Sequence, residues 1–104
     1  MNIEKLEALL ATGHDSAMLR FGLGKAYFDN GEWLKAEEHL RAAIKLQTDY
    51  SAAWQLLGQA LQAAGELDAA LDAFKQGMQI AETNGDQQAY KVMRVMKKRV
   101  ESAQ

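Results

Sequence analysis

The chain contains no cysteine and no proline, and these two absences limit the kinds of site and of secondary structure that it can form. Without cysteine there is no disulfide framework, no thiol nucleophile and no cysteine-ligated zinc, and a reducing compartment is the natural environment. Without proline, and with much alanine, leucine, glutamate and glutamine, the sequence folds into helices at little cost. No apolar run approaches the roughly 18 residues that cross a bilayer, and the N-terminus does not read as a signal peptide. We therefore expect an all-α, cytoplasmic chain with no membrane contact.

The chain also has no large excess of positive or negative charge, because its formal net charge is only -2. Such a balance supplies no general attraction for phosphate backbones, so nucleic acid is not the expected partner. A length of 104 residues supports a single domain. Because long structureless loops are absent too, active-site lids have no place to form.

Short turn signals divide the chain into six helical segments. Glycine occurs with asparagine or aspartate at residues 12–15, 29–31 and 83–86 and with alanine at residues 64–65, and a further break falls near residues 47–49. Turns this short force neighbouring helices to run antiparallel. The pattern predicts about six helices of roughly 11 to 18 residues, in keeping with ordinary helix lengths.

The sequence repeats itself with a shift of 34 residues. Small residues coincide in the two copies, as do large apolar ones at helical spacing. The identical pairs are Asp15 and Asp49, Leu23 and Leu57, Gly24 and Gly58, Ala26 and Ala60, Gly31 and Gly65, Glu32 and Glu66, and Ala36 and Ala70.

This spacing resembles the tetratricopeptide repeat, whose 34-residue pattern carries W, L, G, Y, G, A and F at fixed places. The second copy matches it at Trp54, Leu57, Gly58, Leu61, Gly65, Ala70 and Phe74. The resemblance implies antiparallel helical hairpins stacked as a short right-handed α-solenoid. It places repeat 1 at residues 15–48 and repeat 2 at 49–82, and we expect capping helices at 1–13 and 86–103, all within one domain spanning 1–104.

Close packing of the hairpins is expected at the two repeated glycines. Gly24 and Gly58 have no Cβ, so the second helix of each pair can approach, with Ala36 and Ala70 as matching small surfaces. Larger apolar side chains surround each contact and form the predicted core. They are Leu23, Tyr27, Leu40 and Ile44 in the first copy, and Leu57, Leu61, Phe74 and Met78 in the second.

The helix ends follow from local chemistry. Asp15 and Asp49 precede the first helix of each pair and are expected to cap it. Gly31 and Gly65 are expected in the left-handed conformation that reverses the chain. In the flanks, Ile3, Leu6, Leu9 and Leu10 predict one buried face, and Ala89, Val92, Met93, Met96 and Val100 another.

Function is expected in the concave groove lined by the first helix of each repeat. The resemblance places the second, fifth, ninth and twelfth repeat positions there. Apolar groups and Lys25 from the first copy would meet carboxamides from the second, a combination suited to a peptide or helix with an apolar anchor. The predicted groove residues are Met18, Phe21, Lys25, Phe28, Gln55, Gln59 and Gln62, with Ala52 at the matching position.

Catalysis is not expected. His39 and Glu38 are adjacent on a helix and so do not face each other, and we expect His39 to be solvated. No HExxH, P-loop or G-x-S-x-G string occurs. No metal or cofactor is predicted, and the chain is interpreted as a protein-binding adaptor or scaffold.

Two alternatives remain open. The terminal helices could bury Leu6 and Leu10, or Val95 and Met96, between two copies in a homodimer. The basic face of Lys91, Arg94 and Lys98 could contact RNA or an acidic partner, although a solvated helix face explains it too.

Overall fold

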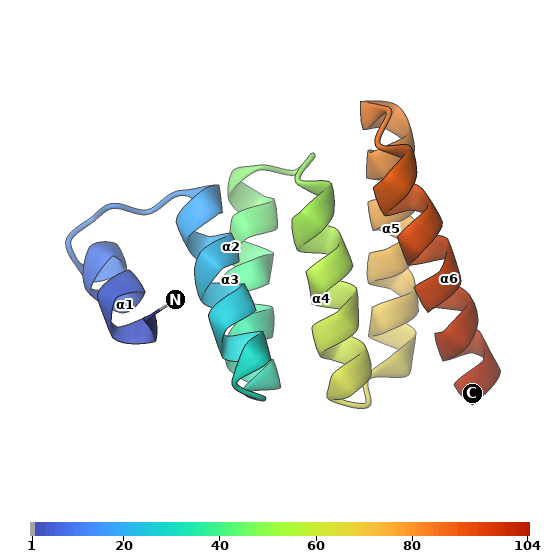
Figure 1. The fold of residues 1–104 in the computed structure, drawn as a ribbon, viewed down its shortest axis with the longest axis horizontal. Coiled ribbons are helices and arrows are strands. Elements are labelled where there is room, and N and C mark those ends of the chain that lie inside the picture. The colour runs from blue at the N-terminus through green and yellow to red at the C-terminus, as the bar shows by residue number, and fades with distance from the viewer. Residues whose placement is uncertain (1) are drawn as a thin grey trace.

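The computed structural model describes residues 2–104, and this part of the chain forms six helices and no strand (Figure 1). Met1, the first residue of the expected N-terminal cap, lies outside the described residues. The helices are α1 (Ile3–Ala11), α2 (Ala17–Asp29), α3 (Trp33–Leu46), α4 (Ser51–Ala63), α5 (Leu67–Asn84) and α6 (Gln87–Ala103). The all-α stack of helical hairpins is confirmed, but α1, with nine residues, is shorter than expected.

The hairpins stand side by side in two layers. Helix α2 pairs with α3 and α4 pairs with α5, while α3 also packs on α4 and joins the two pairs. Helix α6 packs on α5 and touches α4, and α1 touches α2. In Figure 1, α2, α4 and α6 form the nearer layer and α3 and α5 the farther one. We call these the inner layer and the outer layer.

The turns within the hairpins behave as expected. Gly31 and Gly65 have φ angles of 77° and 82°, the left-handed region that residues with a Cβ rarely adopt. The chain therefore reverses between α2 and α3, and between α4 and α5, at the two glycines that the repeat aligns.

The contact between the paired helices corrects one expectation. A Cβ on Gly24 would lie 2.6 Å from Cγ of Leu40, and a Cβ on Gly58 would lie 2.3 Å from Cε1 of Phe74. Large side chains of the outer helices therefore pack against the two glycines. The prediction that the glycines pack against the alanines of the outer helices is wrong. Ala36 and Ala70 are fully buried, yet Leu40 and Phe74 fill the space that the glycines leave.

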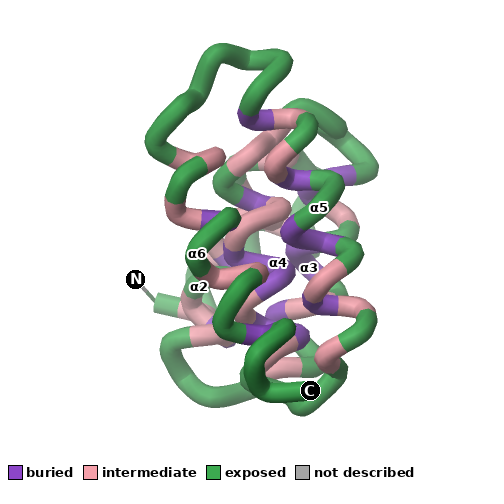
Figure 2. Tube along the Cα trace, turned by 90° about the vertical axis from the view of Figure 1, so that its right-hand side faces the viewer, coloured by how far each residue is buried: buried purple, intermediate pink, exposed green. Residues whose placement is uncertain are grey.

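The core runs along the middle of the stack, where Figure 2 shows the buried segments. Most of the predicted core side chains are buried, while Met78 is half-buried. In α6, Met93 and Val100 are fully buried and Ala89 and Met96 pack against the core, as the spacing predicts.

Three local predictions are wrong. Ser16, not Asp15, caps α2, because its Oγ accepts a hydrogen bond from the Leu19 N–H at 3.1 Å. Helix α4 begins after Tyr50 with no side-chain cap, so Asp49 does not cap it either. Leu9 of α1 is exposed, whereas Ile3, Leu6 and Leu10 of the same helix pack against the core.

Candidate functional site

The predicted groove residues of α2 have different environments. Met18 is 78% exposed. The ring of Phe21 stacks on Tyr50 with centroids 5.1 Å apart, and that of Phe28 packs on Trp33 at 5.4 Å. Lys25 stays 59% exposed and forms an ion pair of 3.2 Å with Asp29. Only Met18 and Lys25 are therefore largely open to solvent.

The predicted groove residues of α4 are three carboxamides. Gln55, Gln59 and Gln62 are half-buried, and Ala52 is exposed. None of the three carboxamides takes part in a side-chain hydrogen bond among residues 2–104, and no buried polar side-chain atom there lacks a partner. Their donors and acceptors therefore reach solvent. Helices α2 and α4 touch, and we call the predicted groove residues of these two helices together the inner surface.

Helix α6 contributes residues that the predicted groove did not include. Tyr90 and Arg94 line a hollow against α5. With 3.6 residues per turn, Val95 and Arg99 lie on a different side of α6, and Val95 is 47% exposed. From the sequence, Arg94 was expected only as part of a basic face and Val95 only as a dimer contact.

A hollow of about 450 Å³ opens between α1 and α2. Ile3 lines it from α1, and Gly22, Lys25 and Asp29 line it from α2. Lys25 thus belongs both to the inner surface and to this hollow, which extends that surface toward the N-terminus.

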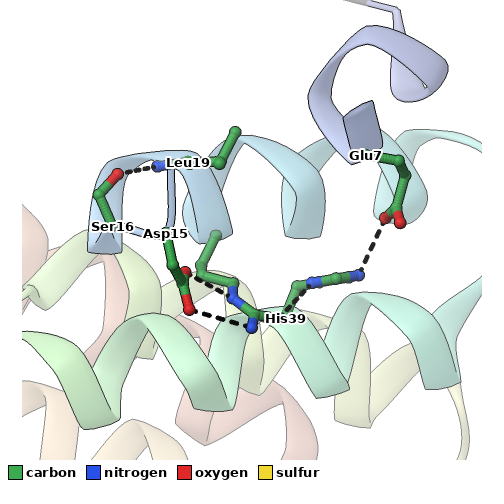
Figure 3. A network of polar contacts seen from close by, with 6 residues as sticks. Glu7, Asp15, Ser16, Leu19 and His39 are labelled. Carbon is green, nitrogen blue, oxygen red and sulfur yellow. Dashed lines mark hydrogen bonds and ion pairs between the residues drawn. The ribbon is translucent and has the colours of Figure 1, made fainter. Parts of the chain in front are cut away.

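A polar network fixes α1 to the first hairpin (Figure 3). One Glu7 oxygen, Oε1, accepts a hydrogen bond from the Tyr27 hydroxyl at 3.2 Å and lies 3.4 Å from Nε2 of His39. On the other side of the imidazole, Nη1 of Arg20 lies 3.1 Å from Nδ1. Arg20 in turn forms a two-pronged ion pair with Asp15, at 2.9 and 3.2 Å.

This geometry sets the protonation of His39. Arginine can only donate, so Nδ1 accepts from Arg20 and the imidazole proton stays on Nε2, directed at Glu7. Burial lowers the pKa of His39 below its usual value, and the nearby Glu7 carboxylate offsets part of that effect. His39 is therefore neutral at pH 7. The hydrogen bond from Arg20 also lowers the pKa of Asp15.

The expectation that His39 is solvated is wrong. Its side chain is buried and stacks on Tyr27 with ring centroids 5.5 Å apart. Its partners come from α1 and α2, far along the chain, rather than from the adjacent Glu38. Within residues 2–104, no three His, Asp or Glu side chains are grouped to hold a metal.

A family model described as the tetratricopeptide repeat matches residues 14–83. The chain therefore belongs to the tetratricopeptide repeat family. Proteins of this family generally bind other proteins, and their domains are typically non-catalytic.

Individual relatives agree with this assignment. The chain is 50% identical to the TPR repeat-containing protein PA0015 of Pseudomonas aeruginosa, over 99% of this chain and 98% of that one. The solution structure of protein BPP2914 from Bordetella parapertussis is 40% identical, with a TM-score of 0.87 over 99% of this chain and 90% of that one. A tetratricopeptide repeat domain from Salinibacter ruber, 19% identical with a TM-score of 0.79 over 86% of this chain and all of that one, shares the fold.

Among residues 2–104, no helix combines the length and the apolar character needed to cross a membrane.

Proposed function

We propose that this chain is a non-catalytic adaptor that binds a peptide or helix of a partner protein on the inner surface of α2 and α4. The proposed binding residues are those that the sequence predicts: Met18, Phe21, Lys25, Phe28, Gln55, Gln59 and Gln62. We propose further that residues 15–48 and 49–82 act as two repeats between caps at 1–13 and 86–103, and that the adaptor works in the cytoplasm.

The main support for this proposal is that the three carboxamide side chains of α4 have no hydrogen-bond partner within residues 2–104. Gln55, Gln59 and Gln62 make no side-chain hydrogen bond within residues 2–104, so their amide groups are available to a peptide backbone. On α2, Met18 exposes a flexible thioether, a group that adapts to different apolar partners. An apolar anchor beside hydrogen-bonding groups is the combination that peptide recognition uses.

The two phenyl rings support this surface differently. Because Phe21 stacks on Tyr50 and Phe28 on Trp33, each ring also holds its own hairpin in place. Truncating them would therefore alter the fold as well as the surface. Met18 and Gln59 make a cleaner test, since neither has a partner of this kind.

The test compares partner capture from native extract by three forms of the chain. We expect Met18→Ala with Gln59→Ala to lose the proteins that the unsubstituted chain retains, as measured by quantitative mass spectrometry. The matched control, Leu34→Ala with Gln47→Ala, removes an exposed leucine and a glutamine elsewhere and should retain them. Thermal unfolding checks that all three forms fold. Equal capture by the inner-surface variant and the control would remove the assignment to this surface.

The homodimer alternative has less support from side-chain positions. Leu6, Leu10 and Met96 pack against the chain's own core, which leaves Val95 as the exposed apolar residue of that set. Light scattering over a concentration series separates the two functions, because a dimer increases the mean mass with concentration.

A further inference from the structure

Within residues 2–104, α6 has no outer helix of its own, although α2 and α4 each carry one. Helix α3 packs on α2 and α5 packs on α4, but no helix of residues 2–104 packs on the outward side of α6. Figure 2 looks onto this end of the molecule, with the outward side of α6 exposed. A groove bounded by α5 and α6 therefore remains open where the next helix would lie.

Two hollows follow one another along this groove. One measures about 270 Å³ and the other about 290 Å³, and Glu82 and Tyr90 line both. We call the combined surface the end groove. Its exposed apolar lining comes from Met78 of α5 and Tyr90 of α6, which are half-buried, whereas Ala81, which also lines it, is fully buried. A slot between two neighbouring helices with an apolar floor matches the shape of a third helix.

The charge of the end groove is mostly positive. Lys75 of α5 and Lys91 and Arg94 of α6 line it and form no ion pair among residues 2–104. A fourth cation, Lys97, is paired with Glu101 at 3.0 Å. Glu82 is the one carboxylate that lines either hollow. A partner that binds the end groove should therefore present an acidic surface, because opposite charges speed association and favour a partner of complementary charge.

We propose that the end groove binds an amphipathic helix of a partner protein, with its apolar stripe on Met78 and Tyr90 and acidic side chains flanking the stripe. This site is separate from the inner surface, so the chain can hold two protein segments at once. The helix that docks completes the third hairpin of the stack by pairing with α6. A second copy fits less well, since the exposed charges of α1 at the opposite end, Glu4 and Lys5, are of mixed sign.

A nucleic acid is the weaker occupant. Binding of single strands depends on exposed aromatic side chains that stack with successive bases. Tyr90 is the one aromatic residue that lines the end groove, and it is half-buried. A phosphate backbone would not bury the apolar lining of the end groove, whereas leucine side chains would bury it and gain hydrophobic free energy.

The test titrates the isotope-labelled full chain with synthetic helical peptides and follows backbone NMR shifts. The first peptide has about 18 residues, close to five turns, with leucines on one stripe and glutamates on both sides of it. A second has lysines in place of the glutamates, and a third has the first composition in scrambled order. We expect the first to shift resonances around Glu82 and Tyr90. We expect the other two to bind at least about tenfold more weakly, since they lack the charge or the stripe.

Charge reversal on the protein gives the matched comparison. Lys91→Glu with Arg94→Glu should weaken binding of the acidic peptide by about tenfold or more. The control, Arg41→Glu with Lys45→Glu, makes the same change of charge on α3 and should leave binding within about twofold, because distant exposed charges are screened. If the groove variant fails to fold, the comparison of the three peptides on the unsubstituted chain still decides.

Several results would overturn the proposal. Equal binding of the scrambled peptide would show that charge alone attracts it. Shifts confined to α2 and α4 would assign the peptide to the inner surface instead. Binding of a uridine oligonucleotide in the end groove without binding of the acidic peptide would make the site a nucleic-acid contact. A dimer that disappears in the groove variant would make it an interface between copies.

Discussion

Substituting Gly58 by alanine tests the packing that holds the second hairpin together. The added Cβ would lie 2.3 Å from Cε1 of Phe74 and 2.6 Å from its Cδ1. Because Phe74 is fully buried, its ring has little room to move away. Overpacking of this kind costs about 1–3 kcal/mol, and the better helix propensity of alanine returns up to about 1 kcal/mol.

Because a contact of 2.3 Å lies far inside van der Waals distance, the overpacking falls in the upper part of this range, about 2–3 kcal/mol, and the expected net loss is about 1–2 kcal/mol. For a chain of this size it corresponds to a fall in Tm of roughly 4–16 °C. Circular dichroism melts measure it directly. A double-mutant cycle with Phe74→Leu tests the cause: the double variant should be more stable than the sum of the single losses predicts, because the shorter side chain relieves the contact. Unchanged or increased stability of Gly58→Ala, or strict additivity in the cycle, would refute the reasoning.

Three further predictions concern the N-terminal half. Ser16→Ala should cost about 1 kcal/mol in urea unfolding through loss of the α2 cap, whereas Asp15→Ala should not remove that cap. Because the folded pKa of His39 lies below its unfolded value, stability should fall as pH drops below about 6.5, and His39→Gln should flatten this part of the pH profile. Glu7→Ala should leave α1 without its polar anchor, so hydrogen exchange in α1 should accelerate while exchange in α4 stays unchanged.

The stack itself could be predicted because it follows from local patterns. The spacing of Leu23, Gly24 and Tyr27 defines a helix face, and Gly31 reverses the chain whatever the rest of the fold does. These features need no knowledge of distant residues. The prediction of Asp15 as the cap failed, because the neighbouring Ser16 can accept the same hydrogen bond and a shift of one residue decides.

The environment of His39 could not be predicted because its partners are remote in sequence. Glu7 and Arg20 reach it only after α1 has folded against α2 and α2 against α3. Nor does spacing predict that Leu40 fills the space at Gly24, since a glycine in a pattern shows that something approaches but not what.

Part of the candidate site could not be predicted from the sequence for the same reason. Phe21 and Phe28 were placed by the family pattern, but their stacking on Tyr50 and Trp33 depends on tertiary structure. The end groove joins residues of α5 to residues of α6, so the sequence offered only a row of basic residues whose neighbours were unknown.

A partner segment bound on the inner surface of α2 and α4 can be detected by site-specific photo-crosslinking in living cells. A photoreactive amino acid replaces Gln59 on α4 in one form of the chain and Arg41 on the outer helix α3 in another. We expect a discrete crosslinked product with another protein from position 59 and none from position 41. A product from position 41 alone would contradict this expectation.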